Sequence, residues 1–323
     1  MFPTAGGQGG PTLAEVGEFG LIDMIIADLP DRSDVLIGPG DDGAVISVDG
    51  PVVCSVDVLV EDVHFKTQWS PAESVGRKAV AVNVADIEAM GATATGLVIG
   101  FAAPPETQQS WVLDFARGLR AECQTAGVAL LGGDISRAAK IAISVTVLGG
   151  LGGLAPVTRS GARPGDVVAL RGRLGWAAAG LAVLGRGFRS PRLAVQAYQV
   201  PDVPYGTGRV AAAAGATSMI DISDGLLADL GHLAERSRVA IDVARNAFEV
   251  PDTLQAVAAA TGSDPLNLIL TGGEDHALAA TFAASDVPED WVVIGSVSGA
   301  VDEPSVTVDG QAWDDDAGWD HYR

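Results

Sequence analysis

Alternating hydrophobic and polar positions predict two strands in the first half of the chain, and helical spacing predicts two helices. Residues 51–59 (PVVCSVDVL) and 141–148 (IAISVTVL) alternate and are rich in β-branched side chains, which is typical of strands. Over residues 72–90 and 108–126 the apolar positions recur with the period of an α-helix. The first half therefore mixes strands and helices.

The second half begins after a glycine-rich, turn-forming passage at 149–156 (GGLGGLAP). A strand at 167–170 and a helix around 175–184 follow it, and a strand at 218–222 runs directly into a helix from 226 to about 236. Three more short strands are predicted nearer the C-terminus, at 266–270, 277–282 and 291–297. Both halves thus have the mixed composition of an α/β or α+β fold.

The length of 323 residues is enough for two domains. We expect a disordered tail at 1–13, an N-terminal domain at 14–150 and a C-terminal domain at 151–323. The first ten residues lack the basic start and apolar core of a signal peptide, and the apolar stretch 141–157 is interrupted by polar residues and glycines. With two cysteines there is no disulfide framework, so we expect a cytoplasmic protein.

The chain has 41 acidic and 20 basic residues, a net charge of −21. This balance argues against binding to nucleic acid or to an anionic membrane, because both need a positive surface. The simplest interpretation of the acids is a solubilising surface. Bound metal ions are the alternative that would allow such a chain to hold an anionic ligand.

The usual nucleotide-binding signatures are absent from the sequence. There is no G-x-x-x-x-G-K-[ST] loop, no H-R-D and D-F-G pair, and no G-x-G-x-x-G placed between a strand and a helix. A P-loop kinase is therefore excluded.

Acids instead occur in short clusters flanked by glycine. Asp42 lies in the turn GPGDDGA, where it could also be an ordinary turn residue. Ser55 and Asp57 are two positions apart on a strand and so share a face. Asp86 lies between Val82 and Met90 on an apolar helical stripe, where a carboxylate is costly unless it is paired or bound to metal.

Three further clusters follow predicted strands. Gly133 and Asp134 follow an apolar run, and glycine there lets backbone approach a ligand closely. The motif DISDG at 221–225 places Asp221 and Ser223 on one strand face, before a helix whose N-terminus offers N–H groups to phosphate. Ser223 or Asp224 could alternatively cap that helix. The last cluster is GGED at 272–275. Clusters of Asp, Glu and Ser without paired Cys and His point to Mg²⁺.

Several of these clusters belong to longer motifs that occur in a fixed order: GDD (40–42), SVDVLVEDVHF (55–65), AVNVADIEAMGA (81–92), LLGGD (130–134), TRSGARPGD (158–166), DISDGLLADLGH (221–232) and TGGEDHAL (271–278). Their combination resembles the thiamine-monophosphate kinase family of the AIR synthase (PurM-like) superfamily. The resemblance runs from about Glu15 to the final Gly-Trp-Asp-His at 318–321, and so covers nearly the whole chain.

The resemblance implies a two-domain PurM-like α/β (α+β) fold. Its N-terminal mixed sheet would bind ATP and Mg²⁺ and pair across a homodimer, and a C-terminal α/β domain would follow. The implied reaction is ATP-dependent phosphorylation of thiamine monophosphate to thiamine diphosphate, with several Mg²⁺ ions.

Carried over position by position, the resemblance also implies roles for individual residues. The metal ligands would be Asp42, Ser55, Val56, Asp57, Asp86, Asp134, Asp221 and Asp224, of which Asp42, Asp57, Asp86, Asp134 and Asp221 would serve catalysis. ATP would be contacted by Gly133, Asp134, Arg159 and Ser223, and the thiamine substrate by His64, Glu274 and Trp319. Val56 stands where the family often has Thr, so it could ligate only through its carbonyl oxygen.

Two other functions remain open from the sequence. One is another ATP-dependent enzyme of the superfamily, similar to AIR synthase or selenophosphate synthetase. The other is a non-catalytic nucleotide-binding module of the same fold. His64, Glu274 and Trp319 favour the thiamine kinase over the related enzymes, and metal-dependent release of ADP would distinguish an enzyme from a module.

Overall fold

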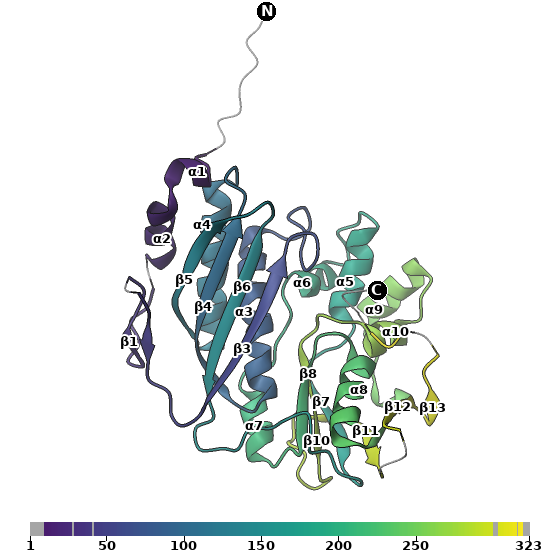
Figure 1. The fold of residues 1–323 in the computed structure, drawn as a ribbon. Helices are drawn as coiled ribbons and strands as arrows, with labels where there is room; N and C mark the ends of the chain where they lie inside the picture. Colours follow the sequence, from purple (N-terminus) through teal and green to yellow (C-terminus); the bar gives the residue numbers. More distant parts are fainter. Residues whose placement is uncertain (1–9, 28, 41, 300–302, 315, 319–323) are drawn as a thin grey trace, which may run out of the picture. The chain divides into compact units, whose positions relative to one another are not determined.

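The computed structural model describes residues 10–27, 29–40, 42–299, 303–314 and 316–318 (Figure 1). It forms two compact units. The first comprises Met1–Ser47, Val56–Val80 and Gly96–Thr146 as far as these ranges are described, and the second Val48–Ser55, Ala81–Thr95 and Val147–Arg323.

A four-stranded sheet has the order β3 (Val52–Val60), β6 (Ala142–Gly150), β4 (Thr93–Ala103) and β5 (Ala129–Arg137). The two strands predicted by alternation are β3 and β6. Strands β4 and β5 are parallel, with a register shift between Leu97 and Val98. Gly133 pairs with Ile99, and a Cβ at Gly133 would lie 2.1 Å from the Ile99 carbonyl oxygen. The close pairing of these strands therefore requires glycine at this position.

Helices α3 (Ala72–Ala89) and α4 (Gln109–Ala126) confirm the two helices predicted in the first half. Phe101 of β4 packs against Phe115 of α4, with ring centroids 5.3 Å apart. A Cβ at Gly118 of α4 would lie 1.9 Å from the Glu73 carbonyl oxygen of α3, so glycine allows the two helices to approach closely. The remaining elements before β3 are α1 (Leu13–Val16), α2 (Glu18–Ile26), β1 (Val35–Ile37) and β2 (Val45–Ile46).

A seven-stranded sheet lies in the second unit, in the order β13 (Gln311–Ala312), β12 (Ser305–Val308), β9 (Ala240–Val243), β11 (Val292–Ser298), β7 (Val167–Arg171), β10 (Ala277–Phe282) and β8 (Ser218–Ile222). Its pairs are antiparallel except β12 with β9, which are parallel, so the sheet is mixed. Strands β7, β8, β10 and β11 match four predicted strands. Met219, Leu278 and Phe282 are fully buried in the core of this unit.

The helices that follow β6 in the described chain are labelled in Figure 1: α5 (Trp176–Gly185), α6 (Arg192–Gln199), α7 (Thr207–Ala213), α8 (Leu226–Ser237), α9 (Asp252–Thr261) and α10 (Pro265–Thr271). A short 3₁₀ turn lies at Arg245–Ala247. Helices α5 and α8 were predicted from the sequence. No helix among the residues that the structure describes has both the length and the apolar character needed to cross a bilayer.

The strand predicted at 266–270 is wrong, because these residues form helix α10. The Asp264 side chain accepts a hydrogen bond from the Leu266 N–H at 2.9 Å, and Pro265 occupies the first turn. An aspartate cap followed by proline starts a helix, whereas proline cannot donate to a sheet. This local start signal outweighs the apolar run that resembles a buried strand.

Candidate functional site

The clearest constellation lies in the second unit, where β8 passes into α8. Asp221, near the end of β8, is only 4% exposed. Gly225, with φ 131°, occupies the cap position of α8. The Asp229 carboxylate, from the first turn of α8, accepts the N–H groups of Asp224 and Gly225 at 3.0 and 3.1 Å. Gly225, rather than Ser223 or Asp224, is therefore the N-cap residue of α8, and Asp229 binds the two N–H groups that come just before the helix.

The loop 272–276 is bonded to this turn along its length. The Glu274 N–H donates to the Ser223 carbonyl at 2.7 Å, and the His276 N–H donates to the Ile222 carbonyl at 2.8 Å. The fit is close, since a Cβ at Gly273 would lie 2.5 Å from the Ser223 carbonyl oxygen. The structure thus brings Glu274 next to the turn that carries Asp221, Ser223 and Asp224.

Asp275, between these two residues, anchors the start of α5. Its carboxylate is buried and accepts the N–H groups of Gly175 and Ala177 at 2.5 and 2.8 Å. Burial raises the pKa of Asp275 to about 7, although the two N–H groups act in the opposite direction. Asp275 therefore ties the loop 272–276 to the start of α5.

Ser55 and Asp86, in the same unit, are hydrogen-bonded to each other. The Ser55 hydroxyl donates to an Asp86 carboxylate oxygen at 2.6 Å. Asp86 is half-buried between fully buried neighbours, Ala85 and Ile87, as its apolar helical stripe predicted. The contact joins two residues 31 positions apart that were both expected to bind metal.

Asp229 and His232 were missed by the sequence analysis. Their ligand atoms and one of Asp224 all lie within 4.8 Å of one another. Burial raises the pKa of Asp229 to about 7, and the charges of Asp221 and Asp224 contribute in the same direction. The sequence did contain a signal for them, because Asp229 and His232 are three residues apart in one predicted helix and so lie on one face of it. That face is next to Asp224.

In the first unit, three predicted residues line one cavity of about 680 Å³: Asp42, Gly133 and Asp134. The remaining wall is largely apolar, with Ile22, Ile26, Phe101, Leu131 and others. The Asp134 carboxylate accepts a hydrogen bond from the Ser136 hydroxyl at 2.9 Å. A cavity of this size is within the range of small-molecule sites.

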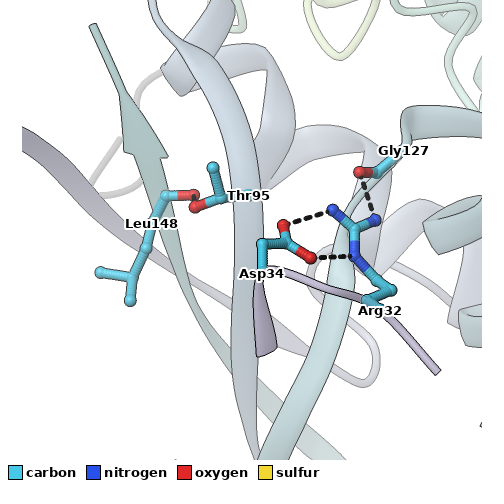
Figure 2. A network of polar contacts seen from close by, with 5 residues as sticks. All are labelled: Arg32, Asp34, Thr95, Gly127 and Leu148. Atoms are coloured by element: carbon cyan, nitrogen blue, oxygen red, sulfur yellow. Dashed lines mark hydrogen bonds and ion pairs between the residues drawn. The ribbon is translucent and has the colours of Figure 1, made fainter. Parts of the chain in front are cut away.

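Arg32 links Asp34 to the Gly127 carbonyl in the first unit, as Figure 2 shows. The guanidinium donates to both oxygens of Asp34, at 2.9 and 2.7 Å, and to the Gly127 carbonyl at 2.7 Å. These bonds hold the pKa of the Asp34 carboxyl below its ordinary value. Figure 2 also shows the Thr95 hydroxyl donating to the Leu148 carbonyl at 3.1 Å, a contact between β4 and β6.

The other predicted residues are placed as follows. Asp57 is half-buried on the same strand face as Ser55, whereas Val56 is 56% exposed on the opposite face. The His64 ring accepts the Val60 N–H at Nδ1, 3.0 Å away, so a neutral ring carries its hydrogen on Nε2. The Arg159 side chain is exposed. Trp319 lies outside the described residues.

The donor set of the site fits a hard cation. Asp86 with Ser55, and Asp221 with Asp224, present carboxylate and hydroxyl oxygens and no sulfur. Oxygen donors of this kind suit Mg²⁺, which keeps several waters and binds through a few carboxylates together with substrate phosphates.

Two family models cover most of the chain. The AIR synthase related protein, N-terminal domain, matches residues 40–151, and the AIR synthase related protein, C-terminal domain, matches residues 163–307. Together they confirm the two-domain PurM-like fold expected from the motifs.

Curated and solved relatives agree with these models. The chain is 47% identical to a thiamine-monophosphate kinase from Mycobacterium tuberculosis, over 97% of this chain and 93% of the relative. It is similar to the crystal structure of a thiamine-monophosphate kinase from Stenotrophomonas maltophilia, with a TM-score of 0.78, 31% identity, and coverage of 91% and 96% of the two chains. The structure of AaThiL complexed with AMPPCP and TMP matches with a TM-score of 0.77 and 32% identity, over 96% of this chain and 99% of that one.

Proposed function

The chain belongs to the thiamine-monophosphate kinase family, within the AIR synthase related proteins, and we propose that it transfers the γ-phosphoryl group of ATP to thiamine monophosphate, forming thiamine diphosphate. One observation carries the proposal. The loop holding Glu274 is hydrogen-bonded to the turn holding Asp221, Ser223 and Asp224, so the residues assigned to substrate, ATP and metal occupy one locked piece of backbone.

We assign Mg²⁺ to the aspartates of this constellation. In the second unit the ion would be held by Asp221 and Asp224, and by Ser55 with Asp86. In the first unit Asp42, Asp57 and Asp134 are the proposed ligands, with the Val56 carbonyl. When bound, Mg²⁺ neutralises phosphate charge and holds the reacting phosphates in line.

The chain's own residues supply binding and orientation. The acceptor is a phosphate monoester that is already largely ionised at neutral pH, so no strong general base is needed. Glu274 is assigned to the cationic thiamine, because a carboxylate attracts the positive charge of its ring. Arg159, exposed near the start of the second domain, is proposed to contact ATP phosphate.

The cavity of the first unit is proposed to receive the nucleotide. Its apolar wall suits a base, and Gly133 and Asp134 at its edge suit the phosphate and its metal. His64 and Trp319 complete the proposed thiamine contacts.

The reaction is tested by incubating the purified chain with ATP, Mg²⁺ and thiamine monophosphate and measuring thiamine diphosphate and ADP. We expect both products in equal amounts. Asp86→Asn keeps the size of the side chain and removes its charge, and should abolish turnover. Asp252→Asn, at an exposed aspartate that begins α9, is the matched control and should keep it. Failure of the wild-type chain to form thiamine diphosphate would refute the proposal.

We also propose a homodimer that pairs the N-terminal sheets. Val56 and Val58 expose 56% and 47% of their surface on the same face of β3, next to Cys54. A row of exposed valines on a strand favours association. Sedimentation should give a dimer, and Cys54 should react more slowly with iodoacetamide as the protein concentration rises. A monomer at all concentrations, with constant Cys54 reactivity, would contradict the pairing.

The division of the chain at residues 150 and 151 remains a proposal, as does a cytoplasmic location. Strand β6 ends at Gly150, and Gly152 and Gly153 both have positive φ, which supports a turn that leads out of the strand there. Limited proteolysis should cut first between 149 and 156 if this passage separates the domains. A first cut elsewhere would move the boundary.

A further inference from the structure

A buried histidine contacts the carboxylate of Asp221. His276 Nδ1 lies 3.1 Å from Asp221 Oδ2, and the side chains are 6% and 5% exposed. We infer that His276 is a positioning residue that fixes the orientation of the Asp221 carboxylate for the cation. The inference rests on the proposed function, because it needs Asp221 to hold metal.

The chemistry of the pair assigns the donor. An ionised carboxylate can only accept, so the hydrogen of this bond belongs to Nδ1 of the ring. The bond occupies Oδ2 and stops the carboxylate from turning about its Cβ–Cγ axis. The other carboxylate oxygen, Oδ1, then has a fixed orientation toward a bound cation. Partners behind metal ligands act in this way in other sites, by orienting the ligand before the ion arrives.

The backbone at His276 is held in a conformation that serves this contact. His276 has φ 52° and Glu274 has φ 68°, both in the left-handed region that side chains other than glycine seldom adopt. Two bonds maintain it, from the His276 N–H to Ile222 and from the Glu274 N–H to Ser223. Strained backbone that persists beside a functional residue is typical of a site organised in advance.

The pairing of strands β10 and β8 fixes the backbone next to His276. Ala277, the next residue, pairs with Ile222, and Leu278 pairs with Asp221 in the antiparallel ladder of β10 and β8. The Cα position of His276 is therefore fixed relative to Asp221 by the sheet itself.

The test uses two variants of His276, Asn and Gln, whose side-chain amide N–H groups lie at different distances from the backbone. The amide nitrogen of Asn takes a place close to Nδ1, whereas that of Gln reaches toward the place of Nε2. Asn also tolerates the left-handed region better than most residues. We therefore expect His276→Asn to keep the contact to Asp221 and His276→Gln to lose it.

The primary measurement is Mn²⁺ binding to the purified full-length chain, followed by the electron paramagnetic resonance signal of free Mn²⁺, without ATP or thiamine monophosphate. Asp221→Asn identifies the sites that depend on Asp221. At those sites we expect His276→Gln to weaken binding by about 10- to 100-fold, and His276→Asn to stay within about three-fold of wild type. The Mg²⁺ concentration for half-maximal activity should shift in parallel, while kcat at saturating Mg²⁺ changes less.

A merely structural histidine predicts a different pattern. His276→Gln would then lower thermal stability and leave Mn²⁺ affinity unchanged. Thr281→Val is the matched control for destabilisation, since it removes a buried hydroxyl of β10 that bonds to Ser218 and Thr217, away from Asp221. If His276→Gln is not recovered folded, His276→Gly replaces it. Glycine adopts a φ of 52° without strain and has no side-chain donor, so the same loss is expected.

The outcomes separate this inference from the proposed function. Unchanged Mn²⁺ affinity in the Gln or Gly variant, or equal losses in the Asn and Gln variants, would overturn the role of His276. No effect of Asp221→Asn would overturn it as well. A chain that forms no thiamine diphosphate but shows the expected Mn²⁺ pattern would instead refute the reaction and leave the positioning role intact.

Discussion

Adding one methyl group at Gly273 should separate the loop 272–276 from the turn that carries Asp221, Ser223 and Asp224. A Cβ at this position would lie 2.5 Å from the Ser223 carbonyl oxygen and 3.2 Å from that of Asp224. Real Cβ contacts do not fall below 3.0 Å, so the backbones must move apart by at least 3.0 − 2.5 = 0.5 Å. The bond from the Glu274 N–H to Ser223, now 2.7 Å, would lengthen toward the limit of a good hydrogen bond.

The expected cost has two parts. Overpacking of this kind lowers the free energy of unfolding by about 1–3 kcal/mol. Activity should fall further than stability explains, because a displacement of about 1 Å at a reacting group can cost roughly 100-fold. For about half that displacement we expect kcat/KM for thiamine monophosphate to fall by about ten-fold, which corresponds to about 1.4 kcal/mol.

Steady-state formation of thiamine diphosphate and urea unfolding of the same preparations measure the two parts. Gly231→Ala is the matched control, since it lies in α8 and its Cβ would meet nothing within 4 Å. Alanine within a helix is favoured over glycine, so that variant should gain up to about 1 kcal/mol of stability and keep its activity. A folded Gly273→Ala protein with kcat/KM within two-fold of wild type would refute the coupling of loop and turn.

Three further predictions concern buried groups. Glu88→Ala removes the acceptor of the Gly206 and Gly208 N–H groups, at 2.7 and 2.8 Å, and should lower the free energy of unfolding by about 2–5 kcal/mol in urea titrations; a loss below 1 kcal/mol would contradict it. Asp275 binds its proton more tightly in the folded chain, with a pKa of about 7 against 3.8, so its contribution to stability is complete below pH 4 and is lost as pH rises through 7. Asp275→Asn should therefore reduce the fall in unfolding free energy between pH 5 and 8, and an unchanged slope would count against this origin. Burial raises the pKa of the Cys123 thiol to about 12, so iodoacetamide should alkylate it in denaturant but not in the folded chain, as mass spectrometry of peptides would show.

The regular elements with a strong internal period were predictable from the sequence. Strands β3 and β6 alternate and helices α3 and α4 repeat with helical spacing, and these patterns reflect which face of each element is buried. Residues 266–270 show where the period fails, because a short apolar run fits a buried strand and a buried helix equally well. Helices α6, α7 and α9 were also missed, since elements of seven to ten residues show too few turns for a clear period.

The candidate site, like the fold, was predictable from the sequence only in part. The sequence alone supplied the glycine-flanked acids and their order, because a carboxylate on an apolar stripe or at a strand end is visible in one dimension. It could not show that Ser55 donates to Asp86, that Glu274 is bonded to Ser223, or that His276 meets Asp221 across 55 positions. The structure also adds a second reason for glycine at position 133, its close pairing with Ile99, to the approach to a ligand that the sequence predicted.

The sequence by itself thus determined the kinds of donor, the family to which they point, and some of the elements that carry them, namely β3, α3 and β8. Only the tertiary structure decided which donors meet and which residues hold them in place. The physical reason is that hydrogen bonds and steric contacts act over a few ångströms, between atoms that the fold brings together from distant parts of the chain.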